Sequence, residues 1–213
     1  MDLVFDIETD DLHATKVWCI VAQNPDSGEI FKFPPSKLEE GYQFLTTADR
    51  LIGHNIIGFD IPMVQKFFDV DLFSGKEILD TLVLSRLFNP TREGGHSLEK
   101  WGFKLGFNKI NFEDYQNYSD DMLDYCVRDV ELNTKVFHEL RKEAKGFSKE
   151  SVKLEHEVAH VMKQQETDGF KFDIKSAQFL LAELRERKQN IEDEVHTTFK
   201  PKWVDDKLVT PYI

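Results

Sequence analysis

Residues 3–8 read Leu-Val-Phe-Asp-Ile-Glu, three large apolar residues followed by two acids on either side of an isoleucine. The apolar opening predicts a strand that is central and buried in its sheet. Side chains two residues apart lie on the same face of an extended chain, so Asp6 and Glu8 are expected side by side. Two like charges at the end of a buried strand need cations as partners. Taken alone, the pair also fits an ordinary solvated turn.

The first half of the chain alternates between strand-like and helix-like segments around this strand. Strand patterns cover residues 17–22, 30–33 and 50–53. The turn residues Asp26, Ser27 and Gly28 predict that the first two of these are paired as an antiparallel hairpin. Helical patterns cover residues 38–45, 62–68, 78–88 and 97–105. The alternation predicts a mixed α/β fold.

A long helix is expected from about Ser119 to Lys145, where Gly146 ends it. Its apolar stripe consists of Leu123, Val127, Val130, Phe137 and Leu140. After Gly146 the composition shifts to two charged amphipathic helices, residues 149–167 and 174–199, with a hinge at 168–173. The tail, residues 200–213, has no periodicity. We therefore predict one domain over residues 1–146 and a helical appendage over residues 147–213.

The 39 acidic and 27 basic residues give a net charge of −12, which argues against a protein that coats nucleic acid by a general positive field. An acidic nuclease remains compatible, because carboxylates that collect divalent cations present metal charge to a phosphate. The two cysteines, Cys19 and Cys126, are interpreted as reduced, buried thiols outside any metal-ligand spacing. No apolar run approaches the ~18 residues of a membrane span, so no membrane partner is expected and the protein should be soluble and intracellular.

Two further segments place acids where chemistry is possible. Residues 53–60 read Gly-His-Asn-Ile-Ile-Gly-Phe-Asp, a short strand that runs into a polar turn and an acid at a helix start. Asp60 could equally be an ordinary helix cap. Residues 125–129 read Tyr-Cys-Val-Arg-Asp, and Tyr125 and Asp129 point the same way because four residues turn a helix by about 400°. They lie about 200° from the stripe that Leu123 begins, so they are expected to face a cleft or solvent, as ordinary surface residues also would.

Together the three segments resemble the exonuclease motifs of the DEDD superfamily of 3′→5′ exonucleases. A tyrosine four residues before the last aspartate marks the branch that contains the proofreading domains of A-family DNA polymerases. Residues 6–12, 80–87 and 96–99 also resemble family segments, most closely those of the replicative polymerases of small-tailed phages. Residues 154–157 and 164–173 are similar, more weakly, to the helical start of a polymerase domain. The palm motifs are absent, so no polymerase activity is expected of this chain.

The resemblance implies a ribonuclease H-like mixed sheet flanked by helices, followed by a helical appendage, and a DNA-hydrolysing 3′→5′ exonuclease with a two-metal-ion mechanism. The ions would be Mg²⁺ or Mn²⁺. Asp6 would bridge both ions, Glu8 and Asp129 would complete the first site, and Asp60 would hold the second largely through water. Tyr125 would orient the attacking water.

The same resemblance implies contacts with the substrate. Thr9 and Leu12 would lie against the terminal nucleotide, and Asn55 would act near the 3′ end. Leu12 could instead be a core residue and Asn55 a turn asparagine. Expected partners are single-stranded or frayed 3′ DNA ends and a polymerase domain or subunit. The expected location is the cytoplasm, that of the host if the protein is encoded by a phage.

Two other functions are compatible with the same motifs. One is an exonuclease-like scaffold or DNA clamp for a polymerase with no activity of its own, although all four acids and the tyrosine are intact. The other is a stand-alone RNA-trimming nuclease of the same superfamily.

Overall fold

The computed structural model describes residues 1–69, 71–72, 74–205 and 207–210. By contacts the chain divides into two compact units, Met1–Thr167 and Asp168–Ile213. The predicted domain boundary at residue 146 therefore differs from this division, which keeps the helix after Gly146 with the first unit.

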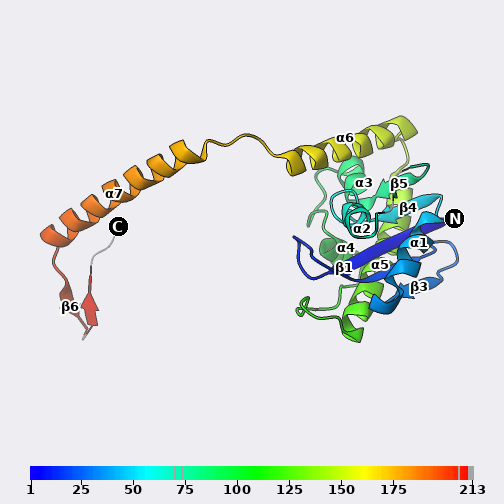
Figure 1. The fold of residues 1–213 in the computed structure, drawn as a ribbon, viewed down its shortest axis with the longest axis horizontal. Coiled ribbons are helices and arrows are strands. Elements are labelled where there is room, and N and C mark those ends of the chain that lie inside the picture. Colours follow the sequence, from blue (N-terminus) through cyan, green and yellow to red (C-terminus); the bar gives the residue numbers. More distant parts are fainter. Residues whose placement is uncertain (70, 73, 206, 211–213) are drawn as a thin grey trace. The chain divides into compact units, whose positions relative to one another are not determined.

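The first unit is built on a five-stranded mixed sheet (Figure 1). Its strands are β1 (Asp2–Thr9), β2 (Val17–Gln23), β3 (Ile30–Phe33), β4 (Arg50–Gly53) and β5 (Glu77–Asp80), in the spatial order β3-β2-β1-β4-β5. β2 pairs with β1 and with β3 in antiparallel fashion, which confirms the predicted hairpin, whereas β4 is parallel to β1 and to β5. The first strand of the chain is thus central, as its apolar residues predicted.

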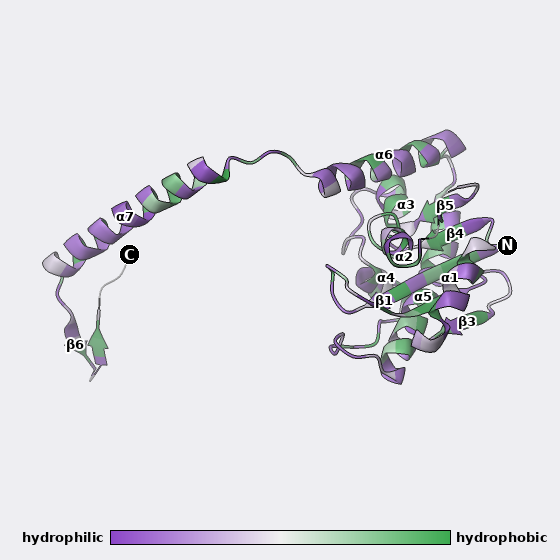
Figure 2. Ribbon diagram, in the orientation of Figure 1, coloured by the Kyte–Doolittle hydropathy of each residue, from purple (hydrophilic) through white to green (hydrophobic). Residues whose placement is uncertain are grey.

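Helices cover both faces of this sheet, which is why β2 and the first half of β1 are largely apolar (Figure 2). One face packs under α1 (Leu38–Thr46), which follows the short 3₁₀ turn η1 (Pro35–Lys37), and α2 (Asp60–Phe68). The other face packs under α5 (Asp120–Glu143) through a cluster of buried residues, Val4, Cys19, Val21, Ile52, Met122, Cys126, Val130 and Phe137. A further core joins α5 to α3 (Thr81–Phe88) and α4 (Leu98–Leu105).

Two sequence predictions were wrong in detail. Residues 78–80 belong to β5 and not to a helix, because Ile78 and Leu79 pair with β4 and the Asp80 carboxylate caps the helix that starts at Thr81. A short apolar run fits both periodicities, and only the strand partner decides. The inner stripe of α5 contains Val130, Phe137 and Leu140 as predicted, but its first part was predicted one residue too far along. Met122 and Cys126 are buried, whereas Leu123 and Val127 lie partly exposed at its flank.

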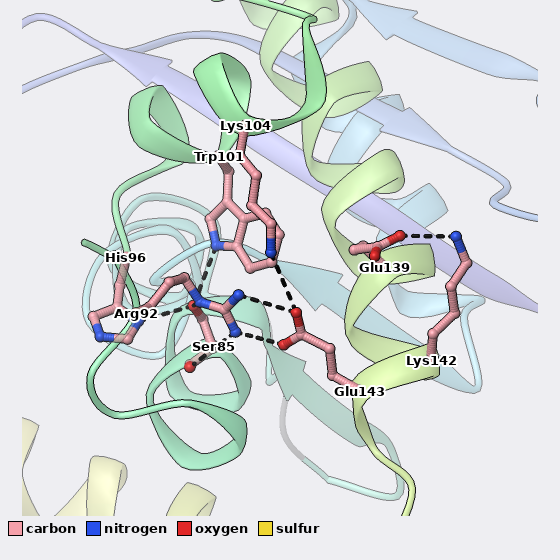
Figure 3. A network of polar contacts seen from close by, with 8 residues as sticks. All are labelled: Ser85, Arg92, His96, Trp101, Lys104, Glu139, Lys142 and Glu143. Atoms are coloured by element: carbon pink, nitrogen blue, oxygen red, sulfur yellow. Dashed lines mark hydrogen bonds and ion pairs between the residues drawn. The ribbon is translucent and has the colours of Figure 1, made fainter. Parts of the chain in front are cut away.

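A buried arginine ties the loop between α3 and α4 to the end of α5 (Figure 3). Arg92 lies 4.2 Å above the centroid of the Trp101 ring and donates to Ser85 Oγ. Its Nη1 donates to Glu143 Oε1 at 3.0 Å, and its Nη2 pairs with the other oxygen. The Arg92 side chain is only 4% exposed, and Glu143 is 26% exposed. The pair is therefore largely desolvated, and the loss of one partner leaves the other charge without compensation.

The helix after Gly146, α6 (Lys149–Asp168), contacts the edge of the sheet. His156 is buried, and its Nε2 accepts a hydrogen bond of 2.8 Å from the backbone N–H of Asp80 at the end of β5. Its Nδ1 lies 2.8 Å from the carbonyl oxygen of Val152, which can only accept. His156 is therefore a neutral imidazole with its proton on Nδ1. Most of the large apolar residues of α6 remain exposed: Leu154, Val158, Val161 and Met162.

The second unit contains α7 (Ile174–Thr198), capped by Asp173 as predicted, and a hairpin of β6 (Lys202–Val204) and β7 (Lys207–Val209). The hairpin lies within the tail for which no periodicity was seen, and residues 211–213 of that tail are outside the described residues. Among its described residues α7 buries none, and Phe179, Leu180, Leu184 and Ile191 are exposed. Within the part of the chain that the structure describes, none of the helices has the length and apolar character that a membrane crossing requires.

The Arg92 network generates a stability prediction. We expect Glu143→Gln to lower the free energy of unfolding by roughly 1–3 kcal/mol, because Arg92 keeps a buried charge with a weaker partner. The matched control is Glu139→Gln on the same helix, whose partner Lys142 is 73% exposed (Figure 3). That change should cost less than about 0.5 kcal/mol. Urea denaturation measures both, and equal effects of the two substitutions would contradict the role given to Arg92.

Candidate active site

Side chains along β1 alternate between the two faces of the sheet, and this alternation directs Asp6 and Glu8 toward α5. Val4 belongs to the core under α5, and Asp6 and Glu8 follow it on the same face at steps of two. The Sγ of Cys126, on the inner stripe of α5, lies 3.6 Å from the carbonyl oxygen of Asp6 and 3.8 Å from its Oδ2. One ligand atom each of Asp6, Glu8 and Cys126 lie within 4.8 Å of one another. The two acids therefore lie between the sheet and the helix, and not in a solvated turn.

The second segment brings Asp60 to the same place. Asp60 is 3% exposed, and its Oδ1 accepts a hydrogen bond of 3.2 Å from the backbone N–H of Ile7, the residue between the two acids of β1. The alternative that Asp60 is an ordinary helix cap is therefore wrong. The turn requires a glycine at position 58, because a Cβ there would lie 2.5 Å from Asn55 Oδ1. Asn55 itself adopts the left-handed backbone conformation, with a φ of 65°.

Asp80 holds the turn that delivers Asp60. Its carboxylate accepts hydrogen bonds from the backbone N–H groups of Asn55 at 2.9 Å and Ile57 at 3.1 Å, and it caps α3 through Leu82. The backbone N–H of Asp80 is in turn bonded to His156. Residues 80–82, which resemble a family segment, therefore have a structural function in this chain: Asp80 fixes the turn before Asp60 and caps α3.

Asp129 and Tyr125 come from α5, and both are buried, with exposed fractions of 4% and 8%. The prediction that they face a cleft or solvent was wrong. Asp129 lies on the inner side of the helix, and residues 107–118, an irregular segment, cover Tyr125. Phe112 stacks on the Tyr125 ring with centroids 5.5 Å apart, and Lys109 Nζ lies 2.6 Å from Asp129 Oδ2.

Desolvation raises the pKa values of all four acids, and repulsion by the other site acids adds to the rise for Asp6 and Glu8. Desolvation, followed by the charges of Asp60, Glu8 and Asp129, raises the pKa of Asp6 well above its usual range. Desolvation is also the main cause that raises the pKa of Glu8 to about 9 and that of Asp60 to about 7. The pKa of Asp129 is raised by desolvation, against the lowering effect of Lys109. A cluster that holds protons at neutral pH is one in which added positive charge is favourable.

The donor atoms present fit a hard divalent cation. Asp129 Oδ1 is a buried oxygen without a hydrogen-bond partner among the described residues. Such an orphaned acceptor is unfavourable unless something binds it. The other donors are carboxylate oxygens, the ligands that Mg²⁺ and Mn²⁺ prefer. Cys126 is free and buried, as predicted, although it belongs to no metal-ligand spacing in the sequence, and it lies beside Asp6. Burial raises the pKa of its thiol strongly, so it lines the site as a neutral group.

The three residues expected to contact the substrate, Thr9, Leu12 and Asn55, differ in exposure. Thr9 is 7% exposed, and its hydroxyl donates to the Asp11 carbonyl. Leu12 is 81% exposed, so the alternative that it is a core residue is wrong. Asn55 is exposed, and its backbone forms the turn before Asp60, which agrees with the turn alternative and leaves its side chain at the surface.

Sequence reasoning missed Lys109, Phe112 and Tyr115, which lie in the irregular segment against the third motif. Tyr115 meets the Tyr125 ring edge-on at 6.3 Å, and its carbonyl accepts from Trp18 Nε1. The available signal was a lysine followed by two aromatic residues just before the tyrosine motif. Such spacing has no periodicity, so only the fold shows that these side chains close the site.

Comparison with known proteins agrees with the motifs. The chain is 26% identical to the DNA-directed DNA polymerase of Enterobacteria phage T3 and 25% identical to that of Escherichia phage T7, in each case over 92% of this chain. It spans 37% of the length of these curated relatives. No protein-family model matches the chain.

Solved structures share the fold at low sequence identity. Brucella melitensis NrnC matches with a TM-score of 0.60 and 17% identity, over 82% of this chain and 89% of that chain. Escherichia coli RNase D matches with a TM-score of 0.58 and 13% identity, over 76% of this chain and 45% of that chain. The family B DNA polymerase of Pyrobaculum calidifontis matches with a TM-score of 0.53 and 16% identity, over 65% of this chain and 24% of that chain.

The ribonuclease H-like fold that the motifs implied is thus confirmed. The chain is homologous to part of the phage T3 and T7 DNA polymerases, and it carries a domain with the fold of the DEDD exonucleases.

Proposed function

We propose that this chain is a metal-dependent 3′→5′ exonuclease that hydrolyses the terminal phosphodiester of DNA. The observation that carries the proposal is the convergence of Asp6, Glu8, Asp60 and Asp129 from three separate segments, with a buried oxygen of Asp129 left without a partner. A purely structural cluster of acids would be paired or solvated. Four acids around one point suit the binding of cations.

The chemistry follows from what these residues can do. Asp6, Glu8 and Asp129 would hold one divalent cation and Asp60, with Asp6, a second. Bound there, the cations would neutralise the phosphate and make water a better nucleophile. Desolvation and the charge of Asp129 raise the pKa of Tyr125 far above its usual range, so its hydroxyl keeps its proton. Tyr125 therefore orients the attacking water by hydrogen bonding and does not act as the base.

The surroundings favour a terminal nucleotide that has left the helical stack. Leu12 is an exposed apolar side chain on the β1–β2 connection, close in sequence to Glu8, and is available to pack on a base. Thr9 and Asn55 would contact the 3′ end. Unpairing the terminal base costs least at a frayed, mismatched or single-stranded end, so such ends should be the preferred substrates.

The relation to phage polymerases supports a place in proofreading. Because the likeness covers 92% of this chain and about a third of the relatives, we propose that the chain is the proofreading part of an A-family DNA polymerase and works beside a polymerase domain or subunit. Its place of action would be the cytoplasm in which that polymerase replicates DNA.

RNA trimming is a second candidate. Brucella melitensis NrnC has been solved with bound pGG and with bound Mg²⁺, and Escherichia coli RNase D is described as an exoribonuclease. The match covers 89% of the NrnC chain, so by this comparison the chain would be a small nuclease that works without a polymerase. End-labelled single-stranded DNA, mismatched duplex DNA and single-stranded RNA, each with Mg²⁺ or with EDTA, decide between the two. Faster cleavage of RNA than of DNA would favour trimming, and no cleavage of any substrate would favour a scaffold.

The raised pKa values predict how stability without metal depends on pH. Glu8 loses its proton near its usual value of 4.5 in the unfolded chain but near 9 in the folded protein. Between these values the folded state binds more protons, so its free energy of unfolding falls as pH rises. Asp60 adds to the fall up to about pH 7. Urea denaturation in EDTA at about pH 5.5 and 8.5 measures the slope, which Glu8→Gln should flatten. An unchanged slope in that variant would mean that Glu8 is not the titrating group.

The shared role of Asp6 and Glu8 predicts that the double change Asp6→Ala with Glu8→Ala abolishes cleavage. The fold should remain, and its metal-free melting temperature should stay the same or rise, because two repelling acids are gone. The matched control removes two exposed acids, Glu39→Ala with Glu40→Ala, and should leave the rate within about twofold. A folded site variant that keeps more than a few per cent of the control rate would refute the assignment.

The hydroxyl of Tyr125 has a separable role. We expect Tyr125→Phe to lower the rate by roughly 10- to 100-fold, which corresponds to about 1.4–2.7 kcal/mol of water positioning. Affinity for Mn²⁺, measured by calorimetry, should hardly change. Tyr118→Phe removes a hydroxyl that lies 3.5 Å from Asp120 and serves as the control. A large loss of Mn²⁺ binding in the Tyr125 variant would show instead that the tyrosine holds the site together.

A further inference from the structure

The irregular segment 107–118 is fastened across the carboxylate site at several points. Arg128 Nε donates to the Asn108 carbonyl at 2.8 Å, and its guanidinium lies 3.3 Å from the centroid of the Phe107 ring. At the other end Gln116 Nε2 donates to the Asp10 carbonyl at 3.2 Å. The segment therefore has a fixed place between α5 and the end of β1, with Lys109 inside it.

Lys109 places its ammonium in the carboxylate cluster. Its Nζ lies 2.6 Å from Asp129 Oδ2 and 4.9 Å from the centroid of the Tyr125 ring. Among the ion pairs of the described residues, this is the one that reaches any of the four site acids. Desolvation by itself would lower the pKa of Lys109, but Asp129, Asp6 and Glu8 outweigh it and raise the pKa. The ammonium is thus charged and acts on three acids at once.

The two oxygens of Asp129 differ in a way that Lys109 explains. Oδ2 is taken by the ammonium, whereas Oδ1 is buried without a hydrogen-bond partner among the described residues. One ammonium group can thus neutralise only part of the negative charge that four acids can carry. A divalent cation bound through Asp129 would lie a few ångströms from the ammonium, and the two would repel. The Lys109 side chain is 26% exposed and flexible, so it can turn outward to water.

We propose that Lys109 is the internal counter-cation of the metal-free site: it holds Asp129 in place and is displaced when a divalent cation binds. The inference rests on the proposed function, because it assumes that the four acids bind metal. Lys109 thereby keeps the acids from repelling one another before metal arrives, and it raises the metal concentration that the site requires. It is a positioning residue and is not expected to act on the phosphodiester.

The first experiment measures Mn²⁺ binding by calorimetry, without nucleic acid, to the full chain and to Lys109→Met. A unit charge about 5 Å from a dication, even in water, alters its binding by roughly tenfold. We therefore expect Lys109→Met to bind Mn²⁺ about tenfold more tightly. In EDTA the same variant should melt roughly 2–6 °C lower, since Asp129 has lost its partner.

The matched control is Lys135→Met. Lys135 is exposed and lies 4.7 Å from the Phe107 ring, so it shares the contact with an aromatic ring but faces none of the four acids. Its removal should leave both the Mn²⁺ affinity and the melting temperature near those of the unchanged chain. Cleavage at saturating Mn²⁺ by Lys135→Met should stay within about threefold of the unchanged rate.

The second experiment tests displacement directly. Lys109 of the unchanged chain should react faster with an amine-acylating reagent in the presence of Mn²⁺ than in EDTA, measured by mass spectrometry with Lys135 as the internal reference. Slower or equal labelling with Mn²⁺ would show that the ammonium stays and would overturn the proposal. So would unchanged or weaker Mn²⁺ binding by Lys109→Met. If the unchanged chain binds no Mn²⁺, the proposed function itself fails.

Discussion

The central strand β1 has helices over both faces, so each of its side chains must enter one interior or the other. Leu3, Phe5 and Ile7 fill the interior under α1 and α2, which leaves the other face to Val4, Asp6 and Glu8. Two acids are thereby committed to the space under α5 by the period of an extended chain. The remaining features of the site respond to this constraint. Asp60 accepts a hydrogen bond from the backbone N–H of Ile7. Asp129 lies on the inner stripe of α5, and Lys109 supplies positive charge to it.

How much of this could be predicted from the sequence depends on the range of each signal. Strand and helix periodicities are local properties of the chain, so they predicted that Asp6 and Glu8 share a face and that Tyr125 and Asp129 point the same way. Their assignment to one site came from the resemblance to the exonuclease motifs. The α/β alternation and the hairpin of residues 17–33 were predicted from local patterns, whereas the mixed sheet was implied by the resemblance. The strand at residues 77–80 was missed, because its hydrogen-bond partner β4 lies more than twenty residues earlier. Tyr125 was predicted to be exposed because the segment that covers it, residues 107–118, has no periodicity to read.

The position of α6 is a further case of a contact that the sequence could not show. Gly146 and the shift in composition suggested a boundary there, whereas contacts keep α6 with the first unit as far as Thr167. The bond from the Asp80 N–H to His156 spans 76 residues of sequence. The Asp80 carboxylate also fixes the turn that carries Asp60, so the buried residue Asp80 links α6 to that turn. A helix that resembles the start of another domain can therefore support the first one.

The net charge of −12 and the internal position of Lys109 together suggest how such a site would treat its substrate. A protein that binds nucleic acid through many lysines and arginines holds the backbone along its length and releases many counterions. In the metal-free site Lys109 is paired with Asp129, and by the proposal above it turns outward when metal binds, so positive charge at the scissile phosphate would come mainly from bound cations. Attraction would then be concentrated at the point of cleavage and weak elsewhere. For the exonuclease proposed above, this distribution of charge would leave the remaining strand weakly bound, which is what the release of correctly paired 3′ ends would require.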